Sequence, residues 1–467
     1  MKKKMTCFAS LLLGLAVALL VACGGGATAP PAGAADAPAA AAAAPAPAAA
    51  APAADAGEAQ VEIRAAWWGD TVRHDLYNAI IDGFEAAHPN VTVVREVAGW
   101  ADYWDRLAIQ TAGGNAPDFM GMHPQFAADY IGRGVLAPLD PFIANGAINM
   151  SGWSQGVIDT GSVRGTLYML AMGVTFASQF VNESAILDLG LPLPSLDWTW
   201  EERFDLAMQA REIFDSRGEY RRWLIGGGDG ALQNFRQFTR QQGFEIYDAE
   251  GNIGFPPESV EAFWTIYYDM RNLNLIPDPA TGVEFFGLTL EESMFAREMI
   301  LIHGAPINQF AMQQATFPDR QMGAVRMPRD PNLAVGEFPE GAHFAISAHV
   351  SEERQLAAAQ LMNHWLNTAE GLYLFRLDQG VPGNEDLHYV FEPHLTDNQM
   401  VILDFVQHCF AFATPSTFPP RGASEVDASF VLHAEMVAFG MMTPAEGARA
   451  FHDEATAIIA RHQAEAD

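Results

Sequence analysis

The strongest constraint on the fold is a strand, helix, strand pattern that begins near residue 61. Residues 61–68 alternate and then become apolar, as a strand entering a core does, and Gly69 and Asp70 end the run. Apolar residues then recur at helical spacing, and a second apolar run follows at 91–94. Strands alternating with helices are typical of a mostly parallel sheet covered on both faces. We therefore predict an α/β fold for the body of the chain.

Size and charge narrow the class of protein further. The chain has 467 residues, of which 49% are apolar, and this is enough for two lobes that each bury a core. With 26 Lys plus Arg against 57 Asp plus Glu, the formal net charge is -31. Such a surface repels phosphate backbones, so we expect no nucleic-acid partner. We interpret the acidity as a solvated surface that keeps an exported protein soluble.

The N-terminus has the pattern of an export signal with a lipid anchor. Lysines at positions 2–4 precede an apolar run at 11–21, which is too short to span a bilayer. The run ends in Leu-Val-Ala-Cys, the spacing of a bacterial lipobox. We therefore predict a signal peptide at 1–22 and acylation of Cys23, which would hold the protein at the outer face of the cytoplasmic membrane, in the periplasm or outside the cell.

A tether is predicted to follow the anchor. Residues 23–57 are almost entirely Ala, Pro and Gly after the cysteine and offer nothing to form a core. About 33 extended residues of about 3 Å each would reach about 100 Å. Of the remaining cysteines, Cys7 leaves with the signal, so Cys409 has no partner for a disulfide. Cys409 lies in an apolar helical run, and we expect it to be buried and inert.

The chain carries no motif for catalysis or metal binding. It lacks the G-x-S-x-G, H-E-x-x-H and P-loop patterns. The glycine-rich run 226–230 is not followed by the Lys and Ser or Thr of a phosphate cradle. The 13 histidines do not fall at the spacing of metal ligands. We therefore expect a binding protein and not an enzyme, with no metal ion and no cofactor.

Several motifs in one order give the body, residues 60–467, a specific resemblance. They are Trp-Trp-Gly-Asp at 67–70, Phe-Glu-Ala-Ala-His-Pro-Asn-Val at 84–91, Gly-Gly-Asn-Ala-Pro-Asp at 113–118, Gly-Val-Leu-Ala-Pro-Leu-Asp at 134–140, Phe-Val-Asn-Glu at 180–183, Asp-Trp-Thr-Trp-Glu-Glu at 197–202, Met-Phe-Ala-Arg-Glu-Met-Ile at 294–300, Phe-Ala-Ile-Ser at 344–347 and Gln-Gly-Val-Pro-Gly at 379–383. The chain thereby resembles the family 1 extracellular solute-binding proteins, which include the maltose-type sugar-binding proteins of ABC importers. Val181, Arg297 and Pro306 depart from the family pattern and leave the ligand class open.

The resemblance implies a type II periplasmic-binding-protein-like fold with two lobes and a ligand cleft between them. Each lobe would be a mostly parallel sheet flanked by helices, and two or three segments would cross between the lobes. We place lobe one at 60–172 plus 325–378 and lobe two at 173–324 plus 379–467.

The resemblance also indicates ligand-binding positions. A sugar needs aromatic rings for its apolar face and short polar groups for its hydroxyls. Trp67 and Trp68 must face opposite ways in a strand, and we choose Trp68 for the pocket. Asp70 either caps the following helix or contacts ligand, and Arg73 either caps that corner or reaches an acidic ligand group. The predicted ligand-binding residues are Trp68, Asp70, Arg73, Trp100, His123, Gln125, Thr175, Phe235, Asn308, Glu340, His343 and Gln379.

The implied function is capture of a sugar or oligosaccharide by hinge closure, followed by delivery to the permease subunits of an ABC importer. We expect a monomer. Three alternatives remain open: a binding protein for a polyamine, peptide or iron complex, a secreted carbohydrate-active enzyme, and an anchored surface protein without a transport role.

Overall fold

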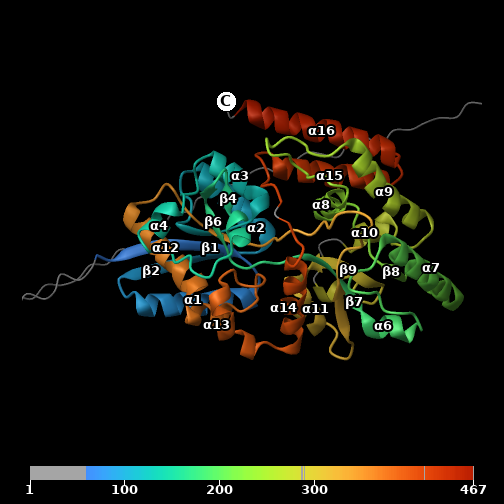
Figure 1. Cartoon of the computed structure of the whole chain (residues 1–467), viewed down its shortest axis with the longest axis horizontal. Coiled ribbons are helices and arrows are strands. Elements are labelled where there is room, and N and C mark those ends of the chain that lie inside the picture. The colour runs from blue at the N-terminus through green and yellow to red at the C-terminus, as the bar shows by residue number, and fades with distance from the viewer. Residues whose placement is uncertain (1–58, 286–287, 289, 415, 466–467) are drawn as a thin grey trace, which may run out of the picture. The chain divides into compact units, whose positions relative to one another are not determined.

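The computed structural model describes residues 59–285, 288, 290–414 and 416–465 (Figure 1). The chain divides into two units, 1–57 and 58–467, and the fold described below belongs to the second. The predicted signal peptide at 1–22, the acylated Cys23 and the tether at 23–57 lie outside the described residues.

A five-stranded sheet organises one half of the folded unit. The predicted strand at 61–68 is present and pairs in parallel with its neighbour, with Val61 opposite Val91. The strands, in spatial order, are β2 (Val91–Ala98), β1 (Val61–Trp68), β3 (Phe119–Met122), β11 (His343–Ile346) and β6 (Met169–Ala171). Buried side chains from β1 and β3 pack beneath helices α1 (Thr71–Ala87), α12 (Glu352–Asn367) and α13 (Ala369–Phe375), which contact one another.

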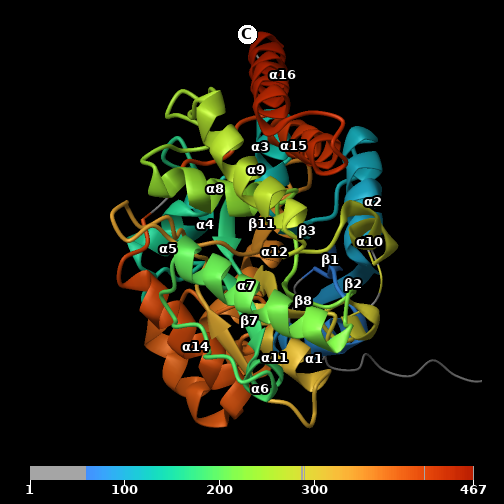
Figure 2. The same ribbon diagram turned by 90° about the vertical axis from the view of Figure 1, so that its right-hand side faces the viewer.

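A four-stranded sheet organises the other half. Its spatial order is β10 (Met322–Val325), β7 (Ala177–Asn182), β9 (Ile300–Pro306) and β8 (Trp223–Ile225). A second core joins this sheet to helices α7 (Trp200–Arg217), α8 (Leu232–Gln241), α9 (Pro257–Asn272), α15 (Ala423–Ala438) and α16 (Pro444–Ala464). Figure 2 shows α15 and α16 stacked over α8 and α9, and α16 contacts both α9 and α15.

The prediction of mostly parallel sheets is confirmed, because in each of the two large sheets all described strands but one run in the same direction. In the first sheet β11 runs antiparallel to β3 and β6, and in the second β7 runs antiparallel to β9 and β10. Each reversed strand is the first strand after the chain crosses from one sheet to the other. Such a strand starts at the edge of the sheet where the chain crosses between the sheets. Its neighbours end at that edge, so the strand runs antiparallel to them.

Three crossing segments lie side by side between the sheets. Val174 forms an antiparallel bridge with Val381, and Thr175 forms one with Glu340. Gly380 has a φ of +105°, and a Cβ at this position would lie 2.3 Å from the carbonyl oxygen of Val174. Glycine is required here both by the backbone conformation and by the close approach of the two segments.

Shorter elements complete the fold. They are α2 (Trp100–Ala112), α3 (Pro124–Gly132), α4 (Asp140–Ala144), α5 (Gln155–Asp159), β4 (Ser162–Val163), β5 (Thr166–Leu167), α6 (Glu183–Asp188), α10 (Pro279–Glu284), α11 (Phe310–Ala315), α14 (Asp397–Phe410) and 3-10 helices at Leu290–Glu292, Ile307–Gln309, Glu385–Val390 and Glu392–His394. Cys409 is fully buried in α14, as predicted, and burial raises the pKa of its thiol to about 12. Among the described helices, none is long and apolar enough to cross a membrane.

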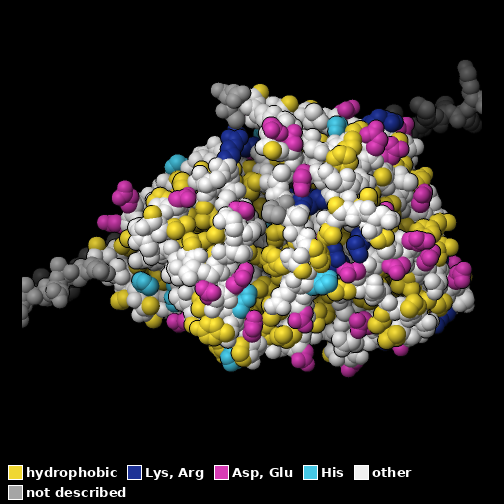
Figure 3. Space-filling view, viewed as in Figure 1, with side chains coloured by type: hydrophobic (Ala, Val, Ile, Leu, Met, Phe, Trp, Pro, Cys, Tyr) yellow, Lys and Arg dark blue, Asp and Glu magenta, His cyan; other side chains and the backbone are white. Residues whose placement is uncertain are grey.

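Figure 3 shows acidic side chains scattered over one face of the molecule among apolar and neutral ones, with few Lys or Arg side chains between them. This distribution agrees with the net charge of -31.

Candidate ligand site

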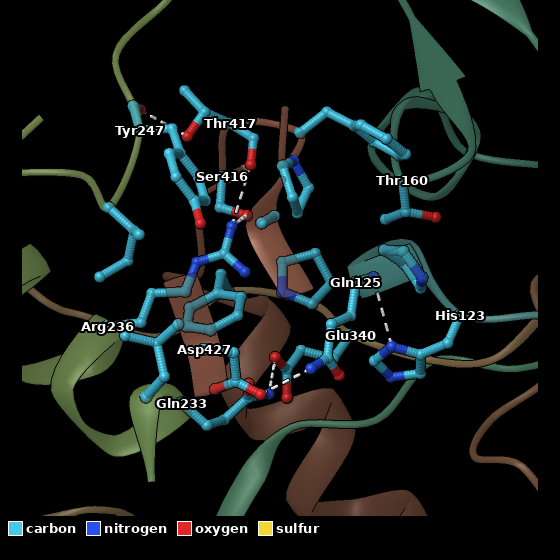
Figure 4. A pocket seen from close by; sticks show the side chains of 18 of the residues that line it. His123, Gln125, Thr160, Gln233, Arg236, Tyr247, Glu340, Ser416, Thr417 and Asp427 are labelled. Carbon is cyan, nitrogen blue, oxygen red and sulfur yellow. Dashed lines mark hydrogen bonds between the residues drawn. The ribbon is translucent and has the colours of Figure 1, made fainter. Parts of the chain in front are cut away.

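A cavity of about 370 Å³ lies where elements of the two halves meet. One wall comes from the start of α3, the end of α5 and β11, and the other from α8, α15 and the segments 338–341 and 416–419. Figure 4 shows Arg236 and Tyr247 on one side of the cavity, facing His123 and Thr160 on the other. The polar residues that line it are His123, Gln125, Asp159, Thr160, Gln233, Arg236, Tyr247, Glu340, His343, Ser416, Thr417 and Asp427.

The first wall presents two neutral histidines. His123 caps helix α3, and its Nδ1 accepts a hydrogen bond of 3.3 Å from the backbone N–H of Gln125. Burial lowers the pKa of His123 to about 4. His343 Nε2 lies 2.9 Å from Thr160 Oγ1, and burial, reinforced by His123, lowers the pKa of His343 to about 3. Both rings are therefore uncharged at neutral pH and offer hydrogen bonds without charge.

The carboxyl groups of Asp427, on α15, and Glu340, in the segment 338–341, face the cavity. The Gln125 amide donates a 2.6 Å hydrogen bond to Asp427 Oδ2, and this bond joins α3 to α15 across the cavity. Burial raises the pKa of Asp427, although the bond from Gln125 opposes the shift. Glu340 accepts a hydrogen bond from Gln233. Burial raises the pKa of Glu340 to about 7, although the positive charge of Arg236 opposes the shift.

Aromatic and cationic groups complete the second wall. Tyr247, Phe338 and Phe418 supply rings. The guanidinium carbon of Arg236 lies 4.3 Å from the centre of the Phe338 ring, and Arg236 Nη2 donates to Ser416 Oγ at 2.5 Å and to the Thr417 carbonyl at 3.0 Å. Rings beside short polar groups suit a ligand with an apolar face and a rim of hydroxyls.

Four of the predicted site residues come together in this cavity: His123, Gln125, Glu340 and His343. Four others form a chain of contacts at the crossing segments. Arg73 Nε donates to Asp378 Oδ2 at 2.8 Å, Asn308 Nδ2 donates to the Asp378 carbonyl at 3.3 Å, and Thr175 Oγ1 donates to Asn308 Oδ1 at 3.3 Å. Gln379 is buried beside Arg73 and Tyr77.

The remaining predicted positions do not line the cavity. Asp70 caps α1, accepting a 2.9 Å hydrogen bond from the backbone N–H of Arg73. Trp68 is buried in an aromatic cluster, with its ring centre 5.0 Å from that of Trp100. Trp100 is half exposed, and its ring centre lies 5.7 Å from that of His123, so the cluster borders the cavity wall from outside. Phe235 is fully buried in the second core.

The sequence interpretation missed most of the second wall. In the segment after the glycine run, the predicted Phe235 packs in the core, whereas its neighbour Arg236 reaches the cavity. Adjacent side chains on a helix point about 100° apart, so one faces the core while the next faces the site. Asp427 is one of several polar residues of α15, and Ser416 lies in the segment before this helix. Neither residue therefore stands out in the sequence.

The described residues contain no group of three His, Cys, Asp or Glu side chains placed to hold a metal ion. The arrangement instead combines neutral donors and acceptors, rings, buried carboxylates and one cation in a cavity between two sheets. These features are typical of a site for a small polar ligand between two α/β lobes.

Comparison with known proteins identifies the family. Residues 79–389 match the profile described as bacterial extracellular solute-binding protein, and the chain belongs to this family. It is 22% identical over 291 residues to a protein named as a binding protein from Brucella abortus (strain 2308), an alignment covering 61% of this chain. The chain spans 66% of that relative's length, just under two thirds.

Solved structures share the fold at low identity. A periplasmic solute-binding protein from Pectobacterium atrosepticum has a TM-score of 0.76 at 22% identity, covering 86% of this chain and 100% of that one. A periplasmic oligogalacturonide-binding protein from Yersinia enterocolitica has a TM-score of 0.75 at 19% identity, with the same coverage. A Listeria monocytogenes ABC substrate-binding protein has a TM-score of 0.71 at 19% identity, covering 85% and 98%. These similarities confirm the predicted two-lobe α/β fold.

Proposed function

We propose that this protein captures a carbohydrate in the cavity between its two sheets and delivers it to the permease of an ABC importer. The observation that carries the proposal is the composition of the cavity. It is lined from both halves by neutral histidines, hydroxyl groups and aromatic rings. Sugar hydroxyls can pair with such groups, and a sugar's C–H face can stack on the rings. Two similar structures are complexes with saturated digalacturonic acid and with cycloalternan, which supports a carbohydrate as the ligand.

Hinge closure belongs to the same proposal. We place lobe one at 60–172 plus 325–378 and lobe two at 173–324 plus 379–467. We propose one change to these bounds: because Asn384 bridges Trp153 and the 3-10 helix at Glu385–Val390 contacts α13, residues 384–390 belong with lobe one. The hinge would consist of the crossing segments that meet at Thr175 and Glu340. A ligand shifts such an equilibrium only through contacts that it makes better in the closed state.

The anchor completes the proposed arrangement. Acylation of Cys23 would place the carrier at the outer face of the membrane, next to the permease, with residues 24–57 as the tether. Radiolabelled palmitate incorporation that is lost in Cys23→Ala would support this part. An unlabelled wild-type chain would contradict the anchor without affecting the binding proposal.

A thermal-shift screen of mono- and oligosaccharides tests the binding function. A bound ligand raises the melting temperature by mass action. For each hit, calorimetry gives the Kd, and small-angle scattering measures compaction on binding. Gln233→Ala removes a polar group from the cavity and should weaken binding about threefold to tenfold, the cost of one hydrogen bond. Gln463→Ala, at an exposed site in α16, is the matched control and should leave the Kd unchanged.

Three results would overturn the proposal. The first is a screen in which no saccharide changes the melting temperature. The second is a hit that binds without any compaction. The third is chromatographic detection of saccharide turnover, which would favour a carbohydrate-active enzyme.

A further inference from the structure

Arg236 is a partly buried cation that forms no ion pair among the described residues. It is the one Lys or Arg side chain among the described residues that line the cavity. None of the described Asp or Glu side chains lies within ion-pair distance of it, and its Nε and Nη1 make no hydrogen bond among the described residues. Arg240, one turn further along α8, differs because it pairs with Glu245. Leaving a desolvated charge without a partner is costly, so such a group marks a place for a ligand of opposite charge.

The guanidinium is also held in a fixed orientation. One nitrogen, Nη2, is bonded to Ser416 and Thr417, and the face of the group packs on Phe338. These contacts leave the Nη1 edge without a partner. A guanidinium immobilised in this way binds a planar carboxylate with little further loss of side-chain entropy.

The other charges in the cavity limit the ligand's charge. His123 and His343 are neutral, so Arg236 supplies a single positive charge. Asp159, Asp427 and Glu340 line the same cavity and would repel a ligand with two negative charges. The carboxyl groups of Asp427 and Glu340 accept hydrogen bonds from Gln125 and Gln233 and form no ion pair with Arg236. A monoanionic carboxylate satisfies the cation with less repulsion than a phosphate dianion would experience.

We propose that the ligand is an acidic saccharide, a sugar or oligosaccharide of the uronic acid class, whose carboxylate pairs with Arg236. This inference rests on the proposed function and narrows its substrate class. The ring and the remaining hydroxyls would contact Phe338 and the polar groups of the opposite wall, while the carboxylate takes the free edge of the guanidinium.

The test compares sugars that differ only in the acidic group. Calorimetry on the full-length protein uses glucuronate against glucose, galacturonate against galactose, and the corresponding disaccharides. Uronates should bind about tenfold to a hundredfold more tightly than the neutral sugars, the range expected for one charge-assisted hydrogen bond. Higher ionic strength should weaken the uronate complexes more than any neutral complex.

Substitutions test whether Arg236 causes the preference for uronates. Arg236→Gln should remove the preference for uronates. Arg236→Lys keeps the charge but not the planar fork, and should retain only part of the preference. Arg221→Gln changes the net charge equally at an exposed ion pair with Glu284 and should bind uronates as the wild type does. If Arg236→Gln does not fold, the wild-type comparison of matched sugars still decides the question.

The outcomes separate this inference from the proposed function. Neutral sugars that bind as tightly as their uronates would overturn the acidic-ligand assignment but leave the carbohydrate carrier intact. Tighter binding of hexose 6-phosphates, or of simple dicarboxylates without a sugar ring, would also overturn the assignment. A protein that binds no saccharide, acidic or neutral, would refute both.

Discussion

Replacing Glu340 with Gln should stabilise the ligand-free protein above neutral pH and leave it unchanged in acid. Burial raises the pKa of Glu340 from 4.5 to about 7. At about 1.4 kcal/mol per unit, ionising this group in the folded protein costs about 3 kcal/mol. The folded state binds more protons than the unfolded state between these two pKa values. The stability that protonated Glu340 contributes is therefore fully present below pH 4.5, falls as the pH rises, and is lost above pH 7.

Urea unfolding at pH 5 and pH 8, followed by tryptophan fluorescence, measures this difference. Glu340→Gln cannot ionise, so the wild type should lose up to about 3 kcal/mol relative to the variant between the two pH values. Glu435→Gln removes the same charge from an exposed site in α15 and should follow the wild type. If wild type and Glu340→Gln keep a constant difference from pH 5 to pH 8, the carboxyl group is not buried as described and the reasoning fails.

Two substitutions and one labelling experiment probe the fold. Gly380→Ala places a Cβ 2.3 Å from the Val174 carbonyl oxygen at a φ of +105°, and should cost about 2 kcal/mol in urea unfolding; a neutral substitution would contradict the close crossing. Thr199→Ala removes the capping box of α7 and should lower unfolding stability by about 1 kcal/mol, with no loss contradicting the cap. Cys409 should resist alkylation in mass-spectrometric mapping until urea unfolds the protein, and rapid labelling of folded protein would contradict its burial.

The fold could be predicted where neighbouring sequence decides it. The strand at 61–68 and the helix after it follow from periodicity and from a cap at Asp70, and both are present. Strand direction was not predictable in the same way. The reversed strands β7 and β11 are set by where the chain crosses between sheets, and no local pattern in 177–182 or 343–346 records that crossing.

The site could be predicted only where it lies next to a strand. His123 follows β3 directly, and the carboxyl end of a strand in an α/β sheet is where ligand groups gather. Arg236 and Asp427 lie on helices, and they reach the cavity because α8 and α15 pack against each other. Whether a helical residue faces a core or a cavity depends on that packing, and periodicity cannot distinguish the two.

Glu340 connects ligand binding with lobe closure in the proposed mechanism. Its backbone pairs with Thr175 in the crossing segments, while its side chain faces the cavity and accepts from Gln233. In the proposed mechanism, a ligand hydroxyl that bonds this carboxyl group would act directly on a segment that rotates when the lobes close. Because such a bond forms fully only when both walls surround the ligand, its free energy favours the closed state over the open one. The same residue would then contribute to affinity and to closure, and a cavity substitution far from the crossing segments would affect affinity alone.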